Sequence, residues 1–159
     1  MFNFSYTLAG GDVIAGQVDG TLQADNNTLV VNSVLDFATF NGVDGPSLPF
    51  VVSTDTFTGL TPNFLSPTLT LDGSFMDFIA CTDGSCNDGF SFNVGNSFSL
   101  LAGGGTPLYN SGATFGDKIE PFNTANWNIQ AVPTPAAIWL LGSGLIGLFG
   151  MRKKLNFAA

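Results

Sequence analysis

The sequence predicts a mainly β protein, with an antiparallel β-sandwich or jelly-roll-like body followed by one C-terminal transmembrane helix. Short runs rich in Val, Phe and Thr recur along residues 1–130. Asp-Gly dipeptides separate many of these runs. An uncharged apolar run of about twenty residues lies near the C-terminus. The chain is therefore expected to consist of a β-rich domain over 1–130 and a C-terminal segment over 131–159.

Alternation of apolar and polar residues predicts the strands of the body. Phe2, Phe4, Tyr6 and Leu8 alternate with polar residues, as in a strand that buries one face. No part of the body shows the i, i+3, i+4 apolar spacing of a helix. Further runs that predict strands lie at 14–18, 28–40, 50–57, 68–71, 75–81, 90–94, 98–101 and 127–131.

Turn-forming residues are expected to separate these strands. Asp tolerates a positive φ and Gly adopts it freely, so each Asp-Gly pair predicts a tight turn. Asn26-Asn27 and Gly103-Gly104-Gly105 are expected to act similarly. Residues 102–126, rich in Gly, Pro, Asn and Thr, are interpreted as a long loop or the start of a linker. The Asp-Gly pairs occur at 19–20, 44–45, 72–73, 83–84 and 88–89.

Charge divides the chain near its C-terminus. The 159 residues include 12 Asp or Glu, 4 Lys or Arg and no His. All the acids lie at or before Glu120, so the first 151 residues have a formal charge of −11. Arg152, Lys153 and Lys154 give the last eight residues +3. Because the body has one base, Lys118, it cannot neutralise phosphates, and nucleic-acid binding is not expected.

The residue types that most catalytic and metal sites require are absent. Without His, neither a Ser-His-Asp nor a Cys-His arrangement can form, and two Cys cannot complete a zinc site. The acidic turn that begins at Asp83 fails as a calcium loop, because its sixth position is Asp88 and its twelfth is Val94. An irregular calcium site stays a minority interpretation. We therefore expect no enzyme, no metal and no cofactor.

Cys81 and Cys86 flank one predicted turn, with Asp83-Gly84 at its tip. This spacing suits a disulfide across a hairpin, which would stabilise the fold by about 2 kcal/mol. Such a bond favours an oxidising compartment. The alternative is two reduced thiols without a role. A redox centre is not expected, because the spacing differs from Cys-x-x-Cys.

The C-terminal segment reads as a membrane span. No residue from Pro121 to Met151 is charged, and the apolar run from Val132 is long enough to cross a hydrocarbon core of about 30 Å. A buried helix in a soluble core is a poor alternative, because the run has no polar face. By the positive-inside rule, the basic stop formed by Arg152, Lys153 and Lys154 stays cytoplasmic, and the body lies across the membrane. The expected anchor residues are Ala136, Trp139, Leu140, Leu141, Leu145, Ile146, Leu148 and Phe149.

This arrangement resembles the PEP-CTERM protein-sorting signal in its Val-Pro-x-Pro-Ala variety. The resemblance covers residues 132–154 and includes Trp139-Leu140, Gly142-Ser143-Gly144-Leu145 and the terminal base cluster. It implies an exosortase substrate of Gram-negative bacteria, held in the inner membrane and then processed. Thr134 stands where the name-giving motif has Glu. The sorting motif maps onto Val132, Pro133, Thr134 and Pro135.

The expected function is that of an exported structural protein of the cell surface or biofilm matrix. One alternative is a lectin-like β-sandwich that binds the secreted exopolysaccharide, which exposed aromatics on a concave sheet would favour. Another is a plain single-span membrane protein with an uncleaved anchor. Export requires a leader, but residues 1–6 read as a strand, so the true start is expected upstream. A tail-anchored cytoplasmic protein would contradict the positive-inside rule.

Overall fold

The computed structural model describes residues 1–59, 66–95, 108–110 and 120–133. These residues form a mainly β, antiparallel fold, as predicted. The strands are β1 (Phe2–Thr7), β2 (Val13–Leu22), β3 (Thr28–Phe40), β4 (Val43–Asp44), β5 (Phe50–Val52), β6 (Thr68–Thr70), β7 (Met76–Cys81), β8 (Asp88–Val94), β9 (Leu108–Asn110) and β10 (Trp127–Ala131). The described helical elements are α1 (Thr54–Thr58) and the 3-10 turn η1 (Thr124–Asn126).

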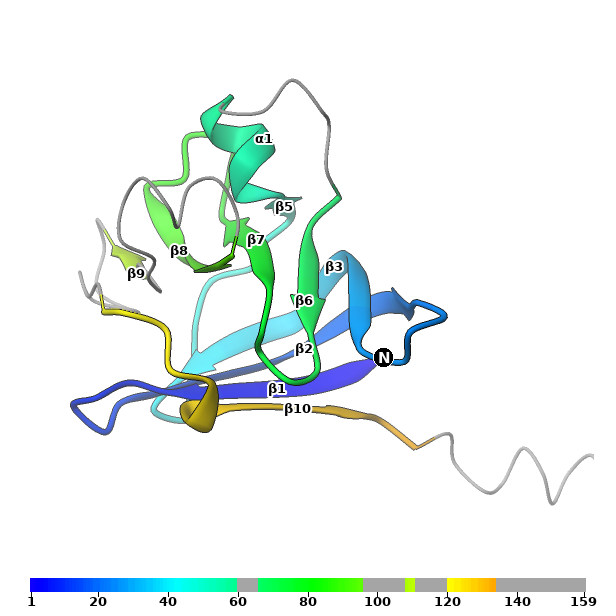
Figure 1. Ribbon diagram of the computed structural model, residues 1–159. Helices are drawn as coiled ribbons and strands as arrows, with labels where there is room; N and C mark the ends of the chain where they lie inside the picture. Colours follow the sequence, from blue (N-terminus) through cyan, green and yellow to red (C-terminus); the bar gives the residue numbers. More distant parts are fainter. Residues whose placement is uncertain (60–65, 96–107, 111–119, 134–159) are drawn as a thin grey trace, which may run out of the picture.

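The strands hydrogen-bond into one sheet in the order β10-β1-β2-β3-β6-β7-β8-β9, with β4 beside β3 and β5 beside β7. Figure 1 shows β6 and β7 running across the direction of β1, β2 and β10. The ring of Phe4 in β1 lies 5.8 Å from that of Phe90 and 6.0 Å from that of Phe92, both in β8. The sheet therefore folds over, and its two parts face each other across the core.

Aromatic side chains fill the space between the two parts of the sheet. Phe92 contacts Phe78 in β7 and Trp127 in β10, with centroid separations of 6.2 and 5.1 Å. The indole N–H of Trp127 donates to the carbonyl of Thr70 at 3.0 Å, so its one polar group is satisfied inside the core. The most buried large side chains include Tyr6, Phe78, Phe90, Phe92, Ile14, Leu29, Leu69 and Met76.

The strand predicted at 50–57 is wrong beyond Val52. Residues 54–58 form α1 instead, because both helix ends are capped. The Ser53 hydroxyl accepts from the N–H of Thr56 at 3.1 Å, and Gly59 ends the helix with φ of +67°. A helix this short has no apolar periodicity, so the pattern that reveals longer helices does not reveal it.

Only two of the five Asp-Gly pairs form the predicted loops, at 72–73 and 83–84. Asp19-Gly20 lies inside β2, where the register with β3 shifts. A Cβ on Gly20 would lie 2.6 Å from the carbonyl oxygen of Val30, so a glycine is needed for the close approach of the strands. Asp88-Gly89 likewise begins β8, and Asp44 ends β4. The turn into β4 is made by Asn41-Gly42, both at positive φ.

Some of the remaining predictions for the body concern residues that the structure describes, and others concern residues outside them. The Asn26-Asn27 turn and the last strand, Trp127–Ala131, are confirmed. The loop predicted at 102–126 contains β9 and η1. The strand predicted at 98–101 and the Gly103-Gly104-Gly105 turn lie outside the described residues.

Candidate functional site

The hydrogen-bonded sheet ends where the predicted sorting motif begins. The N–H of Val132 donates to the carbonyl of Met1 at 3.0 Å and continues the pairing of β10 with β1 by one residue. Val132 is half-buried and Pro133 is exposed. Pro has no N–H and cannot extend this pairing. The first two motif residues thus lie at the rim of the folded body, at the end of β10 (Figure 1).

The rest of the predicted signal lies outside the described residues. This holds for Thr134 and Pro135 of the motif, for the anchor residues from Ala136 to Phe149, and for the basic stop. Among the described residues, neither α1 nor any other helix is long and apolar enough to cross a membrane.

Cys81 and Cys86 form the predicted disulfide, and both are buried. Asp83 organises the loop between them, since its carboxylate accepts from the hydroxyl and the N–H of Ser85. These two bonds, the hydroxyl bond foremost, lower the pKa of Asp83. The carboxylate that suggested a calcium loop therefore acts as a turn acceptor here. Within the described ranges, no group of three or more Asp, Glu, Cys or His is arranged to hold a metal ion.

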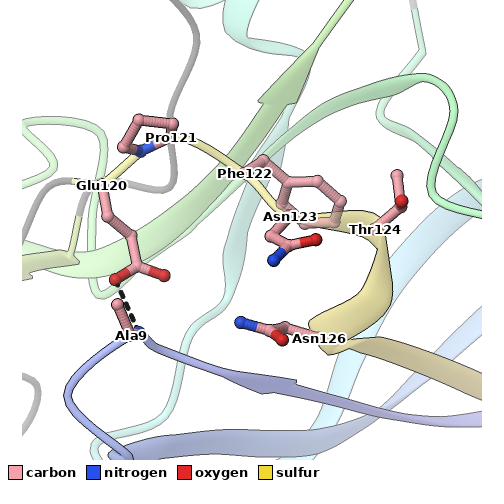
Figure 2. Close-up of a pocket in the computed structure, with 7 residues that line it drawn as sticks. All are labelled: Ala9, Glu120, Pro121, Phe122, Asn123, Thr124 and Asn126. Carbon is pink, nitrogen blue, oxygen red and sulfur yellow. Dashed lines mark hydrogen bonds between the residues drawn. The ribbon is translucent and has the colours of Figure 1, made fainter.

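A shallow hollow of about 450 Å³ lies beside the β1–β2 turn, lined by Ala9 and part of the stretch 120–126. The Glu120 carboxylate accepts from the Tyr6 hydroxyl at 3.0 Å and from the N–H of Ala9 at 2.9 Å. Tyr6 Oη in turn accepts from the N–H of Asn123 at 3.0 Å. Figure 2 shows the Glu120 carboxylate directed at Ala9, with the amides of Asn123 and Asn126 beside the same hollow. These bonds fasten the segment before β10 onto β1.

A second polar cluster is buried between α1 and the outer face of β7 and β8. Asp77 is 1% exposed, and its Oδ1 accepts from the N–H of Asp55 at 3.2 Å. Asp77 pairs across the strands with Asn93, whose amide donates to the Ser91 hydroxyl at 2.9 Å. The four bases of the chain all lie outside the described residues. Asp55 and Asp77 place two carboxyl groups in this buried layer.

Sequence reasoning found the disulfide and missed both polar clusters. The Glu120–Tyr6 bond joins residues 114 positions apart, which local patterns cannot reveal. One feature of the sequence indicates that Asp77 is buried: it is the single acid within the apolar run from Met76 to Cys81. Every residue of that run is buried, so β7 is covered on both faces.

Comparisons with protein-family models, with curated proteins and with solved structures find no match to this chain.

Proposed function

We propose that the chain is an exported structural protein of the cell surface or biofilm matrix, sorted by its C-terminal segment. The observation that carries this proposal is the change in charge and composition of the chain at Val132. A hydrogen-bonded acidic β domain ends there, and an uncharged run followed by Arg152-Lys153-Lys154 begins. The exposure of Pro133 leaves the start of the motif accessible to a processing enzyme. We infer a sandwich-like body followed by one transmembrane helix.

The buried disulfide supports export. Cys81 and Cys86 close a small loop, and such bonds persist in oxidising compartments. The proposed sequence of events is insertion of the apolar segment into the inner membrane, removal of that segment by an exosortase-type protease, and release of the body. The mature body would keep every acidic residue and lose the basic stop.

The distribution of aromatic residues favours a structural role over glycan binding. Among the described aromatic side chains, only Phe57 is strongly exposed, at 41%. The others are buried or half-buried, mostly in the core between the two parts of the sheet. A flat aromatic platform on a concave sheet, which the lectin-like alternative needs, is not found in these ranges.

Mass spectrometry of protein recovered from a host that makes an exosortase tests the sorting proposal. We expect mature protein that lacks the segment from Trp139 to Lys154. Substitution of both Pro133 and Pro135 by Ala should leave the precursor intact, whereas Pro121→Ala, outside the motif, should be processed normally. Recovery of the intact C-terminal segment on all wild-type protein would show an uncleaved anchor instead.

A glycan pull-down tests the lectin-like alternative separately. The full-length chain in detergent, incubated with the host's exopolysaccharide, should stay in the unbound fraction. Saturable binding that Glu120→Ala or Phe57→Ala abolishes would favour the glycan-binding function, and would leave the sorting proposal unaffected.

A further inference from the structure

We propose that Asn41 is a site of spontaneous modification, at which the side-chain amide is lost as ammonia and the residue becomes Asp or isoaspartate. This inference is independent of the sorting proposal. Asn41 is exposed and precedes Gly42 in the turn between β3 and β4. It is the single Asn in the sequence that is followed by Gly.

The reaction at this site needs only the main chain and water. The backbone nitrogen of Gly42 attacks Cγ of Asn41 and closes a succinimide ring. The Cγ–Nδ2 bond breaks, and Nδ2 leaves as ammonia with the proton of the Gly42 amide. Water then opens the ring at either of its two carbonyl groups, which gives Asp or isoaspartate. Ring closure is easiest before Gly, because Gly has no Cβ to restrict the backbone or to shield the attacking nitrogen.

Three hydrogen bonds restrain Asn41 in the folded protein. Its Nδ2 donates to Oδ1 of Asp12 at 2.9 Å, and its Oδ1 accepts from the N–H of Val13 at 2.8 Å. The N–H of Asn41 donates to the carbonyl of Val13 at 2.8 Å. These bonds oppose the rotations that bring Cγ to the nitrogen of Gly42. Asp12 is therefore a positioning residue that slows the conversion.

Conversion would replace a favourable contact by repulsion. A carboxylate at position 41 can still accept from the N–H of Val13, but it has no hydrogen to donate to Asp12. Two carboxylates would then face each other where a donor and an acceptor now lie 2.9 Å apart. Isoaspartate also adds a CH2 group to the main chain of a two-residue turn in which both φ angles are positive. The modification should therefore loosen the link between the β1–β2 turn and the β3–β4 turn.

Asn26 is a matched control within the same chain. It is exposed, and its φ of +56° is close to the +53° of Asn41. The residue that follows it is Asn27, which carries a Cβ. The two positions thus share a backbone conformation at the Asn and differ in the residue that supplies the attacking nitrogen.

Peptide mapping by mass spectrometry, on the full-length chain kept warm in mildly alkaline buffer with mild detergent, tests the site. We expect Asn41 to lose its amide at least about tenfold faster than Asn26. Gly42→Asn, which tolerates the positive φ at that position, should slow the loss at Asn41 toward the rate at Asn26. Equal rates at Asn41 and Asn26, no conversion at Asn41, or a rate that Gly42→Asn leaves unchanged would overturn the proposal.

The same mapping tests the restraint by Asp12. Asp12→Ala removes the acceptor for Nδ2 of Asn41, so conversion should be about 2- to 10-fold faster. An unchanged rate would show that Asp12 is not the positioning residue.

Urea unfolding tests the consequence of the modification. Asn41→Asp produces one of the two products directly and should lower the urea midpoint at neutral pH. Combining it with Asp12→Asn places an amide opposite the new carboxylate and should recover most of the loss. A midpoint unchanged by Asn41→Asp, or a double variant no more stable than Asn41→Asp alone, would contradict the proposed repulsion.

Discussion

The two faces of β7 are both buried, but they are stabilised in different ways. Met76, Phe78 and Ala80 point into the aromatic core, where packing of apolar surface dominates. Asp77, Ile79 and Cys81 point to the opposite side, where α1, the disulfide loop and the side chains of Phe50 and Val52 from the neighbouring strand β5 lie. One face thus depends on ring contacts, and the other combines a smaller apolar cluster with hydrogen bonds and a covalent bond. A small sheet can therefore bury both faces of a strand, although only one of the two faces the large aromatic core.

The largest effect is expected on the aromatic face. Phe78 is fully buried and contacts Phe90 and Phe92, with centroid separations of 5.9 and 6.2 Å. Phe78→Ala should lower the free energy of unfolding by about 3–5 kcal/mol, because it removes apolar contacts and leaves a cavity. Urea unfolding followed by tryptophan fluorescence would measure the loss. Phe78→Leu is the control and should cost clearly less, and equal losses would show that cavity formation is not the cause.

On the polar face, Asp77→Ala should cost up to about 3 kcal/mol, since the buried N–H of Asp55 loses its acceptor. Asp77→Asn keeps an acceptor oxygen at the same place and should recover part of that loss. The same unfolding measurement compares the two variants. If Asn is no better than Ala, the hydrogen bond to Asp55 is not what stabilises this face.

Removal of the disulfide should have a smaller effect. Replacing both Cys81 and Cys86 by Ser removes a constraint on a short loop, and the expected loss is about 2 kcal/mol. Reduction of the wild-type protein should give a similar loss in the same assay. A loss as large as that of Phe78→Ala would mean that the disulfide also holds β7 and β8 in position, in addition to restricting the conformations of the unfolded chain.

The sequence predicts the aromatic face far better than the polar face. Alternating Phe residues reveal β1 and β8 because the period of two is a local property. The five-residue α1 depends on two caps, and Asp77 becomes buried only when residues distant in the chain cover it. Asp19-Gly20 shows the same limit. Its turn propensity is local, yet the shift in register with β3 places it inside a strand.

The candidate sites follow the same rule. Cys81 and Cys86 are five positions apart, and this spacing, together with the export that the C-terminal segment indicates, predicts the bond. The Glu120–Tyr6 bond depends on which strands become neighbours, and no spacing in the chain encodes that order. The proposed sorting signal at 132–154 is a linear pattern in the sequence, because the proposed membrane insertion would respond to composition and length more than to tertiary contacts.

The smallest effect concerns the exposed turn that leads into β7. The N–H and hydroxyl of Ser74 bond to Asp72 at 3.0 and 2.7 Å and, with the N–H foremost, lower the pKa of Asp72 to about 2. A carboxylate whose pKa is lower in the folded state stabilises the fold above its unfolded value, 3.8, and this contribution is lost as pH falls toward 2. Because Asp72 is exposed, solvent screening reduces the contribution to a few tenths of a kcal/mol.

Asp72→Asn should therefore flatten the dependence of stability on pH between about 4 and 2, as urea midpoints at several pH values would show.

Asp88, the first residue of β8, provides the opposite case. Burial raises the pKa of Asp88, so its ionised form costs stability as pH rises. Asp88→Asn should raise the urea midpoint at neutral pH more than at acidic pH. If both variants shift the acid limb alike, Asp72 and Asp88 do not differ in the way that the hydrogen bonds of Asp72 and the burial of Asp88 imply.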